Sequence, residues 1–394
     1  MVKTVHVAFA SHGGAGNAAV NFYKMQRMYG INSEFISRTF KIRISDIIFH
    51  PVLVVFALTD YFLISKKKAY FFSLFRSKLS SHLLKNIKGS IVHIHWAPGM
   101  ATIKDLNALG RNNLKIFIHF HDMWFLTGGC HHSFSCVGYT TDCNTCPFAR
   151  KLYSDIIRQS KFQKLNFLKQ DNVYLIAPST WMQKKIELMD PKLLTKSRLI
   201  PNPVDPDNYR PLSKSLAKKI IGVDPNNIIL GFVASNLNDV NKGIQNFVRE
   251  LEKSIIIDGS NIKLLFVGDG QIKTHMSSLS LKYVENTSQM SILYSAMDIF
   301  INPSIVETFS YTNLEASLHN TPVLSLKNGG SGDTILANLN GFELESINDI
   351  ISKISELLLP NSSYNKIAQN SRSFVLNKFS FNHVNKLLVD FYNL

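Results

Sequence analysis

The sequence predicts an α/β protein made of two doubly wound halves, each a parallel β-sheet with helices on its faces. Three observations carry this prediction. The chain has 394 residues, 45% of them hydrophobic, which is enough for two domains with separate cores. Short apolar runs alternate with helix-like segments along the chain. A cluster of three prolines at 201–206 interrupts this pattern near the middle.

The first half opens with a βαβ unit. Residues 3–10 form an apolar run typical of a strand, and 11–16 form a glycine-rich turn. The apolar spacing over 17–29 predicts a helix, and a second strand follows at 33–37. Because parallel strands need such a crossover, this unit predicts a parallel sheet. Three further strands are predicted in this half, at 90–95, 114–120 and 173–177.

After the prolines the pattern starts again. Apolar runs at 228–234 and 262–267 are typical of buried strands, and each is followed by a helix-like segment. The runs at 298–302 and 321–325 repeat this arrangement. Residues 361–394 lack Gly and Pro, which predicts one or two terminal helices.

The proline cluster also predicts the domain boundary. We expect an N-terminal domain over 1–205 and a C-terminal domain over 206–375, with a helix at about 376–394 that packs back on the first domain. Two lobes imply a cleft between them. Because no cleavable signal peptide opens the sequence, we expect a cytoplasmic protein.

Basic charge is concentrated early in the chain. The protein has 43 Lys and Arg against 28 Asp and Glu, and residues 1–104 hold +11 of the net charge of +15. Basic and aromatic residues interleave over 66–85, which favours an anionic membrane surface as a partner, although a solvated face is the alternative. Nucleic acid is not expected, because the usual binding signatures are missing. Histidine, proline and aspartate interrupt the apolar stretch 47–65, which predicts a buried or interfacial segment.

Gly13, Gly14 and Gly16 lie where the first strand leads into the first helix. Backbone without side chains can approach an anion closely there, and a helix N-terminus supplies positive potential. A phosphate group is the expected ligand. The alternative is a simple tight turn, since the full dinucleotide-binding pattern is missing.

Two acids, Glu307 and Glu315, bracket a predicted helix start. Glu307 is expected to accept hydrogen bonds from a sugar and Glu315 from a ribose, with Lys242 as a cation nearby. Surface acids at a helix start and a solvated lysine are the alternatives. The backbone amides expected to bind a diphosphate are those of Phe309, Ser310, Tyr311 and Thr312.

All four cysteines fall within 130–146, and two histidines directly follow the first. The spacing, with five, six and two residues between them, fits a loop closed by zinc, and reduced thiols are the alternative. Disulfides are not expected in a reducing cytosol. The candidate zinc ligands are Cys130, Cys136, Cys143 and Cys146.

Together these motifs resemble the retaining family-four glycosyltransferases of the GT-B fold. The resemblance spans nearly the whole chain and looks closest to the branch that builds bacterial exopolysaccharides and O-antigens, because that branch carries the segment at 121–130. The motifs, in order, are Gly13-Gly14-Ala15-Gly16, His95-Trp96, His121-Asp122-Met123-Trp124 with Gly128-Gly129-Cys130, Pro201 to Asp205, Asn241-Lys242-Gly243, Gly268-Asp269-Gly270 and Glu307 to Glu315.

The resemblance implies roles for these positions. Gly13, Gly14, Gly16 and Lys242 would bind the donor diphosphate, and Gly268 and Gly270 would line the nucleotide pocket. Glu307 would hold the sugar, Glu315 the ribose, and His121 would lie at the reaction centre. Such enzymes transfer a sugar from a UDP- or GDP-sugar with retention of configuration. The leaving phosphate takes the acceptor proton, and no catalytic metal is expected.

Two positions depart from the family pattern. Relatives often place an arginine shortly before the Lys-Gly pair, whereas 234–239 has no basic residue, so Asn236 is the expected neutral phosphate donor. Pro203 stands where relatives usually have glycine. The expected acceptor is a lipid-linked saccharide at the inner face of the plasma membrane, in surface polysaccharide biosynthesis. The alternatives are a nucleotide-sugar epimerase of the same fold and a non-catalytic, zinc-containing protein that binds membrane or nucleic acid.

Overall fold

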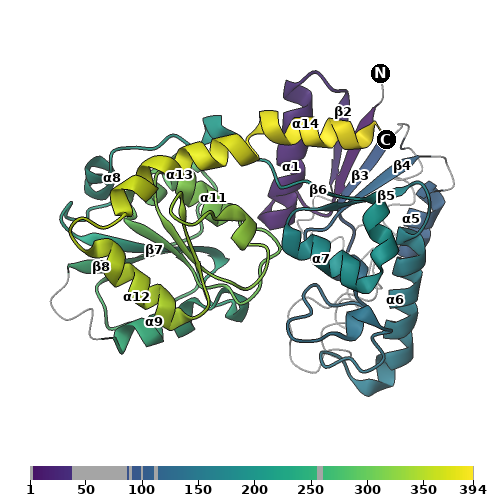
Figure 1. Ribbon diagram of the computed structural model, residues 1–394, viewed down its shortest axis with the longest axis horizontal. Coiled ribbons are helices and arrows are strands. Elements are labelled where there is room, and N and C mark those ends of the chain that lie inside the picture. The colour runs from purple at the N-terminus through teal and green to yellow at the C-terminus, as the bar shows by residue number, and fades with distance from the viewer. Residues whose placement is uncertain are drawn as a thin grey trace, which may run out of the picture. The chain divides into compact units, whose positions relative to one another are not determined.

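The computed structural model describes residues 3–37, 87, 91–98, 101–110, 114–254 and 261–393. They form two compact units, Met1–Pro203 with Asn385–Leu394, and Val204–Val384, each with its own sheet (Figure 1). The basic stretch 66–85 and the apolar stretch 47–65 lie outside the described residues. Within the described part, no helix combines the length and the hydropathy that a membrane span requires.

The N-terminal unit contains a six-stranded parallel sheet in the order β2-β1-β3-β4-β5-β6. The order reverses between β1 and β3, which creates a topological switch point at the carboxyl ends of these strands. The strands are β1 (Thr4–Ala8), β2 (Ser33–Ser37), β3 (Ile91–Trp96), β4 (Lys115–His119), β5 (Val173–Ala177) and β6 (Ser197–Leu199). The helices are α1 (Gly13–Met28), α5 (Ile103–Gly110), α6 (Ser154–Leu168), α7 (Thr180–Met189) and the larger part of α14 (Phe381–Tyr392).

Alternate residues of this sheet point to opposite layers. Val5 and Val7 of β1 belong to a hydrophobic core that α5 and α6 also line. His6, between them, points to the other face. Helices α1 and α14 cover that face and bring Phe22 and Tyr392 into ring contact with the sheet.

The C-terminal unit has a second six-stranded parallel sheet, in the order β12-β11-β10-β7-β8-β9. Here the order reverses between β7 and β10. The strands are β7 (Ile228–Asn236), β8 (Ile262–Asp269), β9 (Ser278–Leu281), β10 (Ile299–Asn302), β11 (Val323–Leu326) and β12 (Gly341–Leu344). The helices are α8 (Lys214–Ile220), α9 (Ile244–Glu252), α10 (Thr287–Ala296), α11 (Tyr311–Leu318), α12 (Ile347–Leu358) and α13 (Tyr364–Phe379).

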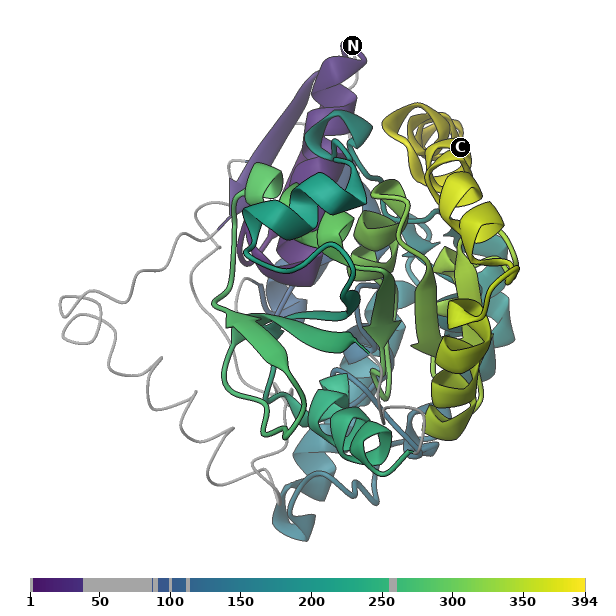
Figure 2. The ribbon, with the colours of Figure 1, turned by 90° about the vertical axis from the view of Figure 1, so that its left-hand side faces the viewer.

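Both faces of the second sheet are buried under helices (Figure 2). Leu264 and Phe266 of β8 pack in one core with α9 and α12, and Leu265 and Val267 pack in another core with α8 and α10. This explains why β8 is a continuous apolar run rather than an alternating one. The predicted fold class, two doubly wound α/β halves with parallel sheets, is confirmed.

Two details differ from the prediction. Helix α1 begins at Gly13 rather than at residue 17, because Gly13 adopts a φ of +74° that turns the chain directly from β1 into the helix. The glycine-rich stretch is therefore the first turn of α1 and not a separate turn. The strands β6, β9 and β12 were not predicted. All three are short edge strands, where half-buried residues leave only a weak apolar signal.

Candidate functional site

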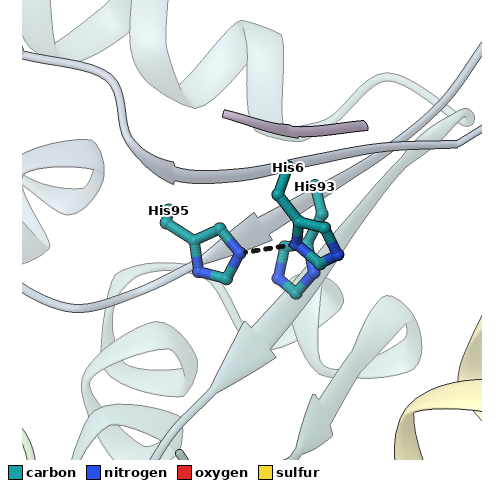
Figure 3. Close-up of side chains that lie close together, drawn as sticks. All are labelled: His6, His93 and His95. Atoms are coloured by element: carbon teal, nitrogen blue, oxygen red, sulfur yellow. Dashed lines mark hydrogen bonds between the residues drawn. The ribbon is translucent and has the colours of Figure 1, made fainter. Parts of the chain in front are cut away.

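Five histidines gather on one face of the N-terminal sheet. His6 lies on β1, His93 and His95 lie on β3, and His119 ends β4 with His121 two residues beyond it. Four of them are at most 2% exposed, and His121 is half-buried. Neighbouring rings stack, as between His119 and His121, whose centroids lie 4.3 Å apart at an interplanar angle of 2°. Figure 3 shows the rings of His6, His93 and His95 close together.

Hydrogen bonds join three of these rings in a directed chain. Gln26 Oε1 accepts from His6 Nε2 at 2.9 Å, so His6 Nδ1 carries no proton and acts as an acceptor. His95 Nε2 donates to His6 Nδ1 at 3.0 Å. His121 Nε2 in turn donates to His95 Nδ1 at 3.0 Å. The chain therefore places the proton of His121 on Nε2 and its lone pair on Nδ1.

The other two histidines form a second chain. Tyr392 Oη lies 2.6 Å from His93 Nδ1, and His93 Nε2 lies 3.3 Å from His119 Nδ1, so hydrogen bonds connect the three side chains. Burial lowers the pKa of all five rings. It lowers that of His6 to about 4 and that of His121 to about 3, and holds the others well below 6.5. The array is therefore uncharged at neutral pH.

Sequence reasoning singled out His121 and His95 but missed His6, His93 and His119. The signal was present as alternation, since histidine recurs at every second position at 93–95 and 119–121. Alternating residues share a face of a strand, and neighbouring strands bring such residues together.

Asp122 holds the loop that follows β4. Its Oδ1 accepts from the Trp124 backbone N–H at 2.7 Å, and its Oδ2 accepts from His131 Nδ1 at 2.5 Å. Trp96 at the end of β3 stacks on the His131 ring at 4.9 Å. Burial raises the pKa of Asp122, but the charge and hydrogen bonds of His131 and Trp124 outweigh it and the pKa is lowered overall. This carboxylate orders the segment next to His121.

Within the first turn of α1 the glycines differ in their surroundings. A Cβ at Gly16 would lie 2.6 Å from the Ala10 carbonyl oxygen, whereas a Cβ at Gly14 would meet nothing within 4 Å. The backbone of Gly16 must therefore stay bare for α1 to pack against the end of β1. Gly14 has no such packing role.

This contrast gives a testable prediction. Gly16→Ala should lower the free energy of unfolding by about 1–3 kcal/mol, because the backbone must shift to relieve the overlap. Gly14→Ala should leave stability within about 0.5 kcal/mol or raise it, because alanine favours a helix. Urea titration followed by tryptophan fluorescence measures both. Equal destabilisation by the two variants would contradict this assignment.

Lys242 and Glu307 form an ion pair at the switch point of the C-terminal sheet. Lys242 ends a 3₁₀ turn after β7, and Glu307 lies in the loop after β10. Lys242 Nζ and Glu307 Oε1 are 2.6 Å apart, and the two side chains are 30% and 17% exposed. Burial lowers the pKa of Lys242, but the charge and hydrogen bond of Glu307 outweigh it and the pKa is raised overall. The pair therefore supplies a fixed cation and a carboxylate where open α/β sheets bind ligands.

Local contacts fix the two loops that carry this pair. Asn241 Nδ2 donates to the Val306 carbonyl oxygen at 2.9 Å, and Asn241 Oδ1 accepts from the Val306 N–H at 3.2 Å. Gly243 adopts a φ of +67°, and a Cβ there would lie 2.2 Å from the Pro303 carbonyl oxygen. In the sequence Asn-Lys-Gly, the Asn241 side chain therefore joins both loops and Lys242 supplies the cation. Gly243 lets the backbone pass close to Pro303.

Helix α11 begins at Tyr311, four residues after Glu307. Ser310 is its N-cap, with Oγ accepting from the Asn313 N–H at 3.4 Å, and Asn302 Nδ2 donates to both Ser310 Oγ and Asn313 Oδ1. The amides predicted to bind a diphosphate, at 309–312, thus surround the start of α11. The Phe309 side chain belongs to the core.

Glu315 lies inside α11 and is bound by two tyrosines. Tyr294 donates its hydroxyl proton to Oε2 at 2.7 Å, and Tyr209 donates to Oε1 at 3.0 Å. Burial raises the pKa of Glu315 although both hydrogen bonds oppose this. Each carboxylate oxygen can still accept a second hydrogen bond.

Gly268 and Gly270 lie where β8 ends. Gly268 has a φ of +149°, and a Cβ there would lie 1.8 Å from the Ala234 carbonyl oxygen at the end of β7. Gly270 has a φ of +103° and lies against the Asn238 side chain. Asn236 is exposed, and its Oδ1 accepts from the Asn238 N–H at 3.0 Å. Backbone packing requires glycine at 268, the positive φ favours glycine at 270, and both residues lie at the same sheet edge as Lys242.

The four cysteines lie in the N-terminal unit as free thiols around one cavity, in the loop between β4 and α6. Among the described residues, two groups of three potential metal ligands have their ligand atoms within 4.8 Å of one another, and both groups consist of histidines. They are His6 with His93 and His95, and His95 with His119 and His121. The structure thus surrounds a cavity with the four sulfur atoms but does not draw three of them that close.

The predicted site residues fall into two sets. The C-terminal unit brings together Lys242 and Glu307, places the start of α11 beside them, and holds Gly268 and Asn236 at the same sheet edge. The N-terminal unit holds the glycines of α1, His121 and the four cysteines.

Comparison with known proteins gives a family match within the C-terminal unit. Residues 227–359 match the model of a family described as glycosyl transferases group 1. The capsular polysaccharide biosynthesis glycosyltransferase CapM of Staphylococcus aureus is 27% identical over 178 residues, 42% of this chain and 46% of the relative. The chain therefore spans less than half of the length of CapM. An uncharacterized glycosyltransferase of Methanocaldococcus jannaschii, MJ1607, is 25% identical over 331 residues, 77% of this chain and 83% of that protein.

Solved structures share the fold along the whole chain. The crystal structure of Anabaena Alr3699/HepE in complex with UDP and glucose has a TM-score of 0.64 at 15% identity, and the match covers 100% of both chains. Sucrose-phosphate synthase of Thermosynechococcus elongatus has a TM-score of 0.68 at 12% identity, covering 100% of this chain and 98% of the other. The protein therefore has the GT-B fold, and residues 227–359 of its C-terminal unit match the glycosyltransferase family model.

Proposed function

We propose that this protein is a retaining glycosyltransferase of family four that transfers a sugar from a nucleotide-sugar donor to a lipid-linked saccharide in surface polysaccharide biosynthesis. The observation that carries the proposal is the Lys242–Glu307 pair beside the start of α11, at the switch point of a sheet whose residues match the glycosyltransferase family model. The HepE structures with UDP and UDP-glucose support a UDP-sugar as donor, and CapM supports a polysaccharide pathway.

The C-terminal unit holds the donor in this proposal. Backbone amides at the start of α11 and the ammonium of Lys242 bind the two phosphates, because both present positive potential to an anion. Glu307 accepts from sugar hydroxyls, and Glu315 accepts from the ribose with the oxygen lone pairs that its tyrosines leave. As the glycosidic bond breaks, negative charge grows on the leaving phosphate. Fixed dipoles and a cation stabilise that charge without reorganisation.

His121 of the N-terminal unit lies at the reaction centre in this proposal. Its hydrogen bond to His95 fixes the ring and presents Nδ1 as an acceptor, and burial keeps the ring neutral by lowering its pKa to about 3. The configuration is retained because the acceptor attacks from the side that the phosphate leaves, and the phosphate takes the acceptor proton. The acceptor and the association with an anionic membrane surface rest on the basic N-terminal quarter of the sequence.

Turnover tests the proposal directly. Purified protein is incubated with UDP- and GDP-sugars and with membrane extract that contains acceptor, and nucleoside diphosphate release is measured. A thermal-shift screen of the same nucleotides identifies the donor first. Acceptor-dependent release and a product with the donor's anomeric configuration are expected. Inversion, release with no acceptor requirement, or no release with any donor that binds would contradict the proposal.

His121→Ala should lower this turnover by about 100-fold or more, as loss of one positioned group at a reaction centre commonly does. His275→Ala, which removes an exposed histidine of the C-terminal unit, is the matched control and should leave turnover unchanged. Equal rates for the two variants would remove His121 from the reaction centre.

A further inference from the structure

The loop between β4 and α6 carries features that sugar transfer does not use. Cys130, Cys136, Cys143 and Cys146 line a single cavity together with small residues, among them Gly128 and Gly138. The Gly138 N–H donates to Cys136 Sγ at 3.4 Å, a bond that stabilises a thiolate more than a thiol. Four sulfur donors in one short loop are the ligand set that Zn²⁺ prefers in structural sites.

Cys143 has an unusual backbone. Its φ of +58° lies in the left-handed region, which costs a residue with a side chain roughly 1–2 kcal/mol relative to the right-handed one. Glycine or asparagine is the usual residue in that conformation. A cysteine at this position indicates that the loop needs the thiol itself.

Two buried lysines lie beside this loop, on α6. Lys161 and Lys164 are 1% and 0% exposed. Their Nζ atoms donate only to backbone carbonyl oxygens at 124–127, at 2.9 to 3.1 Å. Among the described residues, neither ammonium has a carboxylate oxygen within 4.0 Å. Burial lowers the pKa of Lys161 to about 8 and that of Lys164 to about 7, although Asp190 and Asp122 oppose this from a distance. Each ammonium therefore lacks a directly bonded counter-charge among the described residues, which is costly.

The cysteines supply that counter-charge once they bind a metal. Lys161 lies within electrostatic reach of Cys143, and Lys164 within reach of both Cys143 and Cys130. A Zn²⁺ ion with four thiolates carries two more negative charges than positive ones, which equals the charge of the two ammonium groups. We propose that Cys130, Cys136, Cys143 and Cys146 bind one structural Zn²⁺ as thiolates, and that Lys161 and Lys164 balance its charge.

Binding follows simple chemistry. The four thiols release their protons, and the sulfur atoms move inward across the cavity to bind the metal. No atom changes its oxidation state. The histidine groups are a poorer zinc site. Their ring nitrogens already bond to one another, and no described carboxylate makes an ion pair with His6, His93 or His95, so a dication bound by these three would have no directly bonded counter-charge.

Metal content and thiol reactivity test this proposal in the full chain. Protein purified without chelator should contain about one equivalent of zinc, and its four thiols should react with a disulfide reagent rapidly only after chelation. Cys143→Ser and Cys146→Ser should lose the zinc, whereas His93→Gln should keep it. Three outcomes would each overturn the assignment. Zinc could remain bound in both cysteine variants, or be lost only in the histidine variant, or the protein could contain iron and acid-labile sulfide in place of zinc.

The lysines need a separate measurement, because they also bind the carbonyl groups at 124–127. Lys164→Met should weaken zinc binding by about 10- to 100-fold in a chelator competition, the range seen when partners of metal ligands are removed. Lys169→Met, at the residue directly after the end of α6 and with a half-exposed side chain, is the matched control. The lysine would only support the loop if Lys164→Met left the zinc affinity unchanged and lowered the melting temperature equally in the presence and in the absence of zinc.

Discussion

The N-terminal unit should lose about 5.6 kcal/mol of stability between pH 7.5 and pH 5.5. His6, His93, His95 and His119 are buried, and their pKa values in the folded chain lie far below 6.5. In the unfolded chain each ring binds a proton near pH 6.5, so the unfolded state takes up more protons as the pH falls. Stability is therefore complete above pH 7.5 and decreases below it, by about 1.4 kcal/mol for each histidine over this range.

Urea titrations at a series of pH values measure this loss. All three tryptophans, Trp96, Trp124 and Trp181, lie in the N-terminal unit, so fluorescence reports on that unit alone. Most carboxylates titrate below this range and do not produce the loss. His119→Gln should reduce the pH dependence by about a quarter, whereas replacing the exposed His12 tests whether the dependence belongs to the buried rings. A stability that stays level down to pH 5.5 would show that the array is charged or open to water.

Lys242→Met should lower kcat/KM for sugar transfer by about 10²- to 10³-fold. The variant removes the cation that the proposed function places against the leaving phosphate, and it leaves Glu307 partly buried without its partner. Both donor affinity and turnover should fall, because the charge acts on the bound diphosphate and more strongly on the departing one. The nucleoside diphosphate release assay measures turnover, and thermal shift with the same nucleotide measures binding.

The chain offers a matched control for this variant. Lys327 and Glu345 form another ion pair in the same unit, with Nζ and Oε1 2.7 Å apart, but both side chains are more than half exposed. Lys327→Met should leave kcat/KM unchanged, because water screens an exposed pair. If Lys242→Met retained full turnover, or if both variants lost activity equally, the donor site would have to lie elsewhere.

Much of the C-terminal site could be predicted from the sequence because its signals are local. Strand β8 is buried on both faces and therefore reads as one apolar run, and the Lys-Gly pair and Glu307 each follow such a run. Parallel strands place all these loops at one sheet edge. The ion pair itself was not predicted, because the sequence does not show which two loops after strands become neighbours at the switch point.

The histidine array was harder to foresee because it depends on strand order. His6 pairs with His93 across β1 and β3, although 86 residues separate them, and His95 reaches His121 only because β4 lies next to β3. The prediction for Glu315 was likewise incomplete, because it did not include the residues that bind its carboxylate. Its partners Tyr209 and Tyr294 come from separate elements, and neither lies near it in the sequence. Edge strands such as β6 were not predicted for a different reason. Too few of their residues are buried to produce a recognisable apolar pattern.

Helix α14 has a consequence for the order in which the protein is made. Its residues from Asn385 onward belong to the N-terminal unit, where Tyr392 bonds to His93 and Phe391 packs on Phe117. A ribosome translates these residues only after the whole of Val204–Val384. The first unit to emerge must therefore wait, with the part of this sheet face that α14 covers still exposed, until the second has been synthesised. During that interval the nascent chain exposes its histidine-bearing face to chaperones and proteases.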